Sequence, residues 1–83
     1  MPTPLKLYVK SGCPWCVSAK HYLDQHHYQY EEMDVSRNPA AYDEMIRLSG
    51  QTCAPTLWVN GKILADFGPD ELDQFLKSES ILP

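Results

Sequence analysis

Aliphatic side chains alternate with other side chains between positions 5 and 10, the first pattern along the chain. Leu5, Leu7 and Val9 stand at every second position, which is the period of a β-strand with one buried face. Ser11-Gly12 interrupt the alternation, so we expect the strand to end there.

The pattern then changes to the spacing of a helix. Cys16, Ala19 and Leu23 recur at intervals of three and four residues and form one apolar face. Pro14 fits the first turn of this helix, where a missing backbone N–H leaves no hydrogen bond unmade. The sequence therefore predicts a strand followed at once by a helix, with Cys13 at the junction.

Two further elements occupy the middle of the chain. Residues 28–35 are rich in aromatic side chains and predict a second strand. Asn38-Pro39 are typical of a helix cap and a first helical position, and Gly50 suits the end of the same helix.

A hairpin and a final helix complete the pattern. Residues 56–59 and 62–65 flank Asn60-Gly61, the pair that a type I′ turn favours, and predict two antiparallel strands. The last helix begins near Pro69, where the acidic pair Asp70-Glu71 suits the positive end of its dipole.

These elements follow one another in the order βαβαββα. A right-handed crossover makes the first two strands parallel, and the hairpin makes the last two antiparallel. The expected fold class is therefore α/β, with a four-stranded mixed sheet flanked by three helices. A chain of 83 residues leaves room for one domain, residues 1–83.

Composition and charge narrow the function classes. The hydrophobic fraction of 43% is too high for a disordered chain, and a net charge of −4 without a basic cluster argues against a nucleic acid partner. No apolar stretch approaches the roughly 20 residues that span a bilayer, and no secretory signal is visible, so we expect no membrane partner. Three cysteines do not make a disulfide framework. We expect a monomer in the reducing cytoplasm.

Cys13 and Cys16 have the spacing of a redox-active pair at the start of a helix. Only a thiolate attacks a disulfide, and the unpaired N–H groups and the dipole at a helix N-terminus stabilise an anion. Cys13 lies at that end, whereas Cys16 lies one turn further in and can attack a mixed disulfide formed on Cys13. These positions predict a nucleophilic Cys13 and a resolving Cys16.

A metal or iron–sulfur site is the main alternative use of such a pair. Structural zinc takes four nitrogen or sulfur ligands, and the missing two could come only from Cys53, His21, His26 or His27. His21 follows Cys16 by five residues, roughly 140° around a helix, and cannot easily face the same ion. We expect no bound metal and three solvent-exposed histidines.

Three segments of the chain together resemble the glutaredoxin family. They are Lys10-Ser11-Gly12-Cys13-Pro14-Trp15-Cys16, Ala54-Pro55-Thr56 before a strand, and Phe67-Gly68-Pro69-Asp70-Glu71-Leu72. The resemblance implies the thioredoxin fold with sheet order 2-1-3-4, and a cis peptide bond before Pro55 beside the cysteines. The backbone of Ala54 would then pair with an extended cysteinyl substrate, as an added strand does.

The resemblance also implies an activity and a set of contacts. Proteins of this family are thiol–disulfide oxidoreductases that reduce disulfides of proteins and of glutathione, with glutathione as co-substrate and no tightly bound cofactor. Lys10 matches the lysine, and Asp70-Glu71 the acidic pair, that such proteins use for glutathione. The full set of implied substrate or glutathione contacts is Lys10, Pro14, Trp15, Ala54, Pro55, Gly68, Asp70 and Glu71.

Several positions depart from the glutathione-binding pattern and leave the electron donor open. Phe67 replaces the first residue of a usual Gly-Gly pair, and Pro69 removes a backbone donor. Tyr42 and Thr52 stand where Gln or Arg commonly assists glutathione binding. Phe67, Pro69 and Asp70 instead resemble the small redoxins that reduce ribonucleotide reductase and are recycled by thioredoxin reductase. Those two enzymes are the alternative partners.

Two further residues within or next to these motifs are candidates for a role, Cys53 and Trp15. We expect Cys53 to be a small buried hydrophobic side chain. The alternative is a regulatory thiol that lies beside the redox pair and is glutathionylated or oxidised. For Trp15 we expect a substrate platform, because an apolar ring with one N–H donor suits a hydrated protein surface.

Overall fold

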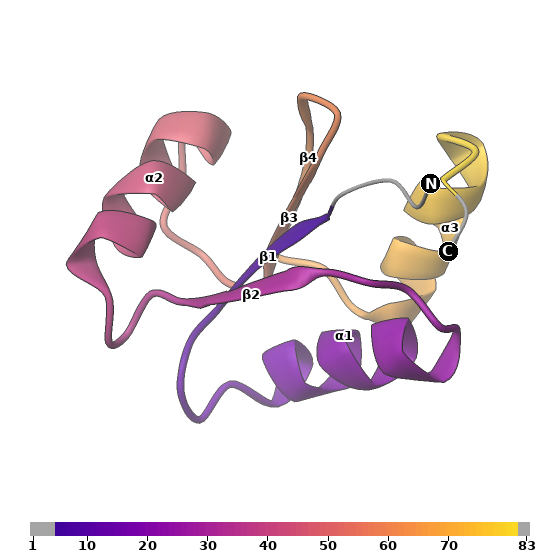
Figure 1. The fold of residues 1–83 in the computed structure, drawn as a ribbon, viewed down its shortest axis with the longest axis horizontal. Coiled ribbons are helices and arrows are strands. Elements are labelled where there is room, and N and C mark those ends of the chain that lie inside the picture. Colours follow the sequence, from indigo (N-terminus) through magenta and orange to yellow (C-terminus); the bar gives the residue numbers. More distant parts are fainter. Residues whose placement is uncertain (1–4, 82–83) are drawn as a thin grey trace.

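Residues 5–81 are described in a computed structural model of the protein, in which a four-stranded sheet is packed between helices (Figure 1). The elements are β1 (Lys6–Val9), α1 (Pro14–Gln25), β2 (Glu31–Asp34), α2 (Pro39–Ser49), β3 (Thr56–Val59), β4 (Lys62–Ala65) and α3 (Pro69–Ser78). The strand order is β2-β1-β3-β4, with β1 parallel to β2 and antiparallel to β3, and β3 antiparallel to β4. This topology is that of the thioredoxin fold, which confirms the expected fold class.

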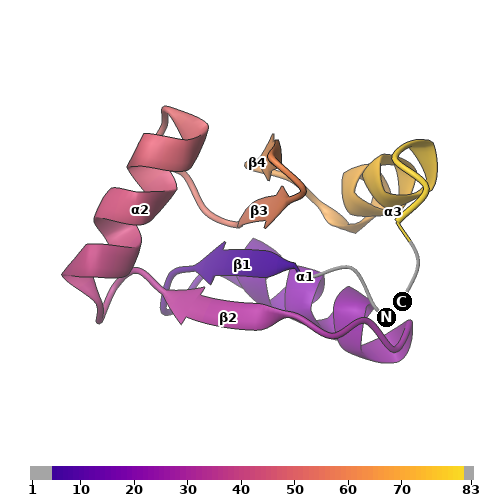
Figure 2. The same ribbon diagram turned by 45° about the horizontal axis from the view of Figure 1, so that its top comes forward.

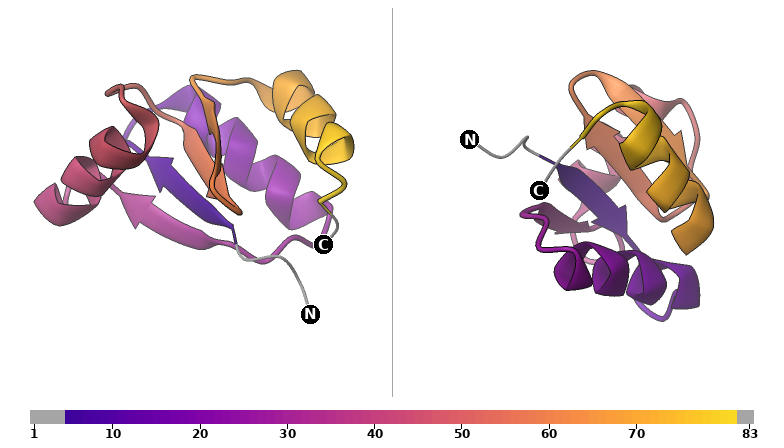
Figure 3. Two further views of the ribbon diagram at one scale, coloured as in Figure 1. Left: turned by 90° about the horizontal axis from the view of Figure 1, so that it is seen from above. Right: turned by 90° about the vertical axis from the view of Figure 1, so that its right-hand side faces the viewer.

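Helices α1 and α3 cover one face of the sheet, and α2 covers the other (Figures 2 and 3). The larger hydrophobic cluster lies under α1 and α3, and its members include Leu7, Val9, Leu57, Val59, Cys16, Leu23, Leu72 and Leu76. The smaller cluster lies under α2 and consists of Tyr8, Val35, Ala41 and Met45. Neighbouring residues of β1 therefore enter different clusters, as alternation along a strand requires.

Local sequence signals set the ends of α2 and of the hairpin. The Asn38 side-chain oxygen accepts hydrogen bonds from the backbone N–H groups of Ala40 and Ala41, at 3.1 and 3.3 Å. Gly50 ends the helix in the left-handed region, at φ 71°. Asn60-Gly61 also have positive φ, at 51° and 78°, as a type I′ turn requires.

The second strand is shorter than the sequence predicts. Only Glu31–Asp34 of residues 28–35 form the strand β2. The backbone N–H of Tyr28 instead donates to the carbonyl of Leu23 at 2.9 Å, after His27 has adopted a φ of 63°. Tyr28 therefore closes the C-terminal end of α1 and cannot begin the ladder with β1.

The helices of the described segment are short. They have 12, 11 and 10 residues, and α1 is the longest. Within residues 5–81, no helix combines the length and the apolar character needed to cross a bilayer.

Candidate functional site

Cys13 is the cap residue at the N-terminus of α1. Its backbone is extended, and its sulfur accepts a hydrogen bond from the backbone N–H of Cys16 at 3.3 Å. The sulfur thus takes the place of the oxygen of a Ser or Asp in most helix caps. The first-turn N–H groups and the helix dipole stabilise negative charge at this position. The side chain is half-exposed, so an incoming disulfide can reach it.

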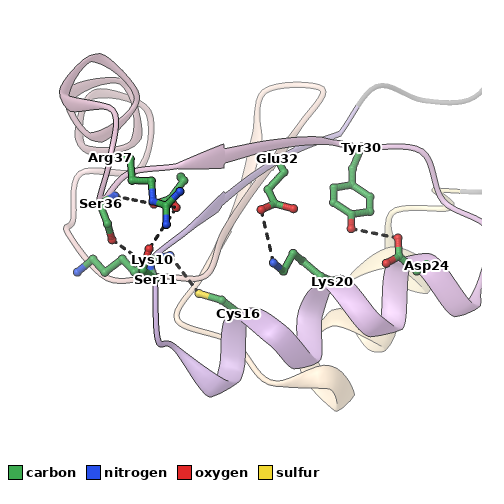
Figure 4. Close-up of polar contacts among 10 residues, drawn as sticks. Lys10, Ser11, Cys16, Lys20, Asp24, Tyr30, Glu32, Ser36 and Arg37 are labelled. Carbon is green, nitrogen blue, oxygen red and sulfur yellow. Dashed lines mark hydrogen bonds and ion pairs between the residues drawn. The ribbon is translucent and has the colours of Figure 1, made fainter.

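Cys16 lies one turn further along α1 and is only 2% exposed. Its sulfur accepts a hydrogen bond from the backbone N–H of Lys10 at 3.5 Å (Figure 4). Burial, followed by the contact with the Cys13 sulfur, raises the pKa of the Cys16 thiol from 9.0 to about 11. The pair is therefore asymmetric, with an accessible sulfur at the helix cap and a protonated one beneath it.

A loop from the second half of the chain faces Cys13. The Ala54–Pro55 peptide bond is cis, which confirms the expectation from the resemblance. The Cys13 sulfur lies 4.0 Å from the carbonyl oxygen of Ala54. The backbone N–H of Asp66 donates to the carbonyl of Pro55 at 2.9 Å and ties this loop to the residue after β4. The fold thus brings Ala54 and Pro55 beside a cysteine 41 residues earlier in the chain.

Trp15 projects from the first turn of α1 and is 58% exposed. Its indole ring lies beside Gly68, where an added Cβ would be 3.4 Å from the ring. Trp15 and residues 66–71 line an open hollow of about 310 Å³. The exposed ring forms one wall of a surface depression near Cys13, the location at which we expect a substrate platform.

The first turn of α3 also lines this hollow. Gly68 caps the helix without a side chain to accept its N–H groups, and Pro69 occupies the first turn. Asp70 and Glu71 are exposed in the same turn. Within residues 5–81, neither carboxylate has a Lys, Arg or His nitrogen within 4.0 Å. Their charges therefore face solvent at the helix N-terminus.

Lys10 follows the last residue of β1 and is half-buried. Figure 4 shows its side chain running away from the Cys16 sulfur, which only its backbone contacts. In the part of the chain that the structure describes, no carboxylate lies within 4.0 Å of the Lys10 ammonium group. The side chain is therefore available to an anionic ligand.

Hydrogen bonds among Ser11, Asp34 and Ser36 hold the loop before Cys13, and of these residues only Ser11 belongs to a motif recognised in the sequence. Figure 4 labels the two serines. Ser11 donates through its backbone N–H to the Ser36 hydroxyl at 3.0 Å, and through its own hydroxyl to Asp34 at 3.2 Å. Asp34 also accepts a hydrogen bond from the Ser36 N–H at 2.9 Å. An Asp side chain commonly bonds the backbone two residues on, so this turn had a visible signal in the sequence.

Cys53 is exposed, so the expectation of a buried hydrophobic side chain is wrong. The residue lies in the loop between α2 and β3, outside both hydrophobic clusters. Its backbone N–H donates to the side-chain oxygen of Gln51. The backbone of Cys53 is thus held by the protein, while its thiol faces solvent.

No metal-binding cluster stands out among the described residues. Nowhere in residues 5–81 do three or more Cys, His, Asp or Glu side chains gather closely enough to hold an ion. His21, His26 and His27 are exposed, as expected, and His26 stacks on Tyr22 with 4.2 Å between ring centroids.

Comparison with known proteins agrees with this geometry. The family model described as Glutaredoxin matches residues 5–64. Glutaredoxin 3 of Escherichia coli strain K12 is 31% identical over 68 residues, which cover 82% of this chain and 80% of that protein. The crystal structure of the thioredoxin-like protein BC3987 has a TM-score of 0.80 and 30% identity, and covers 87% of this chain and 99% of its own.

A more distant structure shows the same fold. The glutaredoxin-like protein NrdH-redoxin from Escherichia coli has a TM-score of 0.71 and 22% identity, and the match covers 86% of this chain and 92% of that one. The family model spans well over half of the chain and includes both cysteines of the site together with Ala54 and Pro55. The chain therefore belongs to the glutaredoxin family.

Proposed function

We propose that the protein is a glutathione-dependent thiol–disulfide oxidoreductase that acts through Cys13 and Cys16. The observation that carries this proposal is the asymmetry of the two sulfurs. Cys13 is half-exposed and caps a helix, whereas Cys16 is buried one turn deeper with its N–H donated to the Cys13 sulfur. An accessible nucleophile with a sheltered partner is the arrangement that stepwise disulfide exchange needs.

The reaction proceeds through two exchanges. The Cys13 thiolate attacks one sulfur of a substrate disulfide, forms a mixed disulfide and releases the first substrate thiolate, which takes up a proton. Cys16 then loses its proton and attacks the Cys13 sulfur, which releases the second thiolate and forms the Cys13–Cys16 disulfide. Two glutathione molecules reduce this bond and leave as glutathione disulfide, so the substrate gains the two electrons that glutathione loses.

The surroundings of Cys13 suit the parts of glutathione. Lys10, which lacks a carboxylate partner among residues 5–81, would meet a glutathione carboxylate. The Ala54 carbonyl lies near Cys13 and would pair with the backbone of the glutathione cysteine. Asp70 and Glu71 would face the ammonium group at the γ-glutamyl end. A reducing compartment such as the cytoplasm would keep both thiols reduced.

Serine variants test the two roles. Cys13→Ser should abolish reduction of a protein disulfide, because a serine hydroxyl does not attack a disulfide sulfur at neutral pH. Cys16→Ser should accumulate a mixed disulfide at Cys13, visible by mass spectrometry under non-reducing conditions, while reduction of glutathione mixed disulfides continues with one thiol. Full activity of the Cys13→Ser protein would exclude the proposal.

A second candidate function uses the same cysteines with another electron donor. Pro69 removes one N–H from the helix start that would bind the γ-glutamyl carboxylate, and Phe67 is buried beside it at 2% exposure. Phe67 and Pro69 match residues found at these positions in small redoxins. Those redoxins are recycled by thioredoxin reductase and reduce ribonucleotide reductase. The oxidised protein should be incubated with NADPH and either thioredoxin reductase or glutathione plus glutathione reductase. Turnover with thioredoxin reductase alone would favour this second function.

A further inference from the structure

Gln51 lies at the centre of the loop that carries Ala54. This loop joins the end of α2 to the start of β3. The neighbouring residues Thr52 and Cys53 are exposed, but Gln51 is half-buried. Its side chain turns back into the loop, where it forms hydrogen bonds on both sides of the exposed segment.

Both ends of the Gln51 amide have partners. Its nitrogen lies 3.0 Å from the Ser49 hydroxyl, 3.2 Å from the Cys53 carbonyl and 3.0 Å from the Thr56 hydroxyl. Its oxygen accepts the backbone N–H of Cys53. A backbone N–H can only donate, which fixes which end of the amide is oxygen. The amide nitrogen has two hydrogens for three acceptors, so it shares them among Ser49, Cys53 and Thr56.

These contacts fix the backbone of Cys53, the residue that precedes Ala54. Gln51 holds the N–H of Cys53, and Gln51 and Thr56 together hold its carbonyl, with the Thr56 hydroxyl donating at 2.7 Å. The Thr56 side chain is fully buried and cannot shift freely. The position of the Ala54 backbone opposite the Cys13 sulfur therefore depends on the Gln51 amide.

We propose that Gln51 is a positioning residue for disulfide substrates, because it orders the Ala54 backbone with which an extended substrate pairs. The inference rests on the proposed function of Cys13 and adds a residue that touches neither the sulfur nor the substrate. A substrate without a peptide backbone has nothing to pair with Ala54. Gln51 should therefore matter for peptide disulfides and not for small ones.

A single-turnover experiment tests this selectivity without any glutathione or reductase. Reduced protein is mixed with an excess of one of two disulfides, and acid-quenched samples are separated to measure the Cys13–Cys16 disulfide formed with two released thiols. One substrate is the symmetric disulfide of a six-residue peptide with a central cysteine. The other is the disulfide of 2-mercaptoethanol, which has no backbone amide.

The variants are chosen to keep the size of the side chain. Gln51→Met removes every hydrogen bond of this side chain. It should slow oxidation by the peptide disulfide about tenfold, roughly the effect of losing one ordered hydrogen bond between the substrate and Ala54. Oxidation by the disulfide of 2-mercaptoethanol should change less than twofold. Gln51→Glu keeps an oxygen for the Cys53 N–H but loses the donor, and should lie between wild type and Gln51→Met with the peptide.

The matched control is Gln74→Met, because Gln74 is exposed on α3 and makes no side-chain hydrogen bond within the described residues. It should behave as wild type with both substrates. Equal slowing of both substrates by Gln51→Met, or slowing of neither, would overturn the role of Gln51. If instead wild type and Cys13→Ser react alike with the peptide, the proposed function itself fails.

Discussion

The sulfur of Cys13 accepts a backbone hydrogen bond at the helix cap, whereas the sulfur of Cys16 is enclosed beneath it. The helix therefore gives two chemically identical side chains different environments. Burial keeps Cys16 protonated at neutral pH, with its pKa raised to about 11. In the proposed reaction, a protonated Cys16 would leave the mixed disulfide on Cys13 long enough for a second substrate molecule to compete for it.

This difference predicts how the second exchange depends on pH. Burial, the first cause of the raised Cys16 pKa, persists when Cys13 is held in a mixed disulfide, so the fraction of Cys16 thiolate should rise with pH throughout the neutral range. Rapid-quench measurement of the second substrate thiol released should show the same rise in rate between pH 6.5 and 8.5. The Cys16→Ser protein should release only the first thiol, and a pH-independent second release in wild type would contradict the prediction.

The exposure of Cys53 gives a second prediction for a single residue. After oxidation of Cys13 and Cys16 to a disulfide, a maleimide should label one thiol per molecule, because Cys53 is exposed. Mass spectrometry of labelled protein should show one adduct, and none in a Cys53→Ser variant. An unlabelled wild-type protein would mean that the thiol is buried after all. Cysteine is among the residue types most often buried, but the exposure of Cys53 could not be predicted from its residue type. It is set by the position of Cys53 in the loop between α2 and β3.

Each of the three helices begins with a cap residue followed by proline, but the caps differ. Cys13 caps α1 with sulfur, Asn38 caps α2 with an amide oxygen, and Gly68 leaves α3 without a side-chain cap. The N–H groups of α2 are thus satisfied within the helix, whereas α1 and α3 direct theirs toward the proposed substrate site. A cap residue followed by proline therefore begins all three helices, but only the N-termini of α1 and α3 lie at the proposed substrate site.

The structural role of the α2 cap can be tested by substitution. Asn38→Ala removes the acceptor of two backbone N–H groups and should lower the free energy of unfolding by about 1 kcal/mol. Asn38→Asp keeps an acceptor oxygen and should retain most of the stability. Denaturant unfolding measures both. The oxidation rate of Cys13 in the folded Asn38→Ala protein should be unchanged, and a slower rate would tie α2 to the site.

Element boundaries were predictable where a residue that readily adopts positive φ ends a helix or forms a turn. Gly50 ends α2 in this way, and Asn60-Gly61 form the hairpin turn. The sheet order was not predictable from hydrophobic periods, which specify faces but not neighbours, and it came from the family resemblance. The error at residues 28–35 has a similar cause, because a side-chain pattern does not tell which carbonyl the Tyr28 N–H will meet. The role of Gln51 could not be predicted, because its four contacts exist only once the loop has folded.

At the scale of the whole molecule, the two hydrophobic clusters contribute unequally to the stability of the fold. The larger one packs α1 and α3 together on one face of the sheet and so fixes Trp15 and the start of α3, which line the hollow, relative to each other. The smaller one under α2 has four buried members. An 83-residue chain has little stability to spare, so the integrity of the site depends chiefly on the larger cluster.

Two leucine variants that lose the same atoms compare a position inside the larger cluster with a position outside both clusters. Leu72 is fully buried in the larger cluster, and Leu72→Ala should lower the unfolding free energy by about 2–5 kcal/mol. Leu48 on α2 is 38% exposed, and Leu48→Ala should lower it by about 1 kcal/mol or less. Denaturant midpoints measure both, and the reaction of Cys13 with the peptide disulfide should fall only in Leu72→Ala, at temperatures where that protein begins to unfold. Equal destabilisation by the two variants would contradict the weight assigned here to burial in the larger cluster.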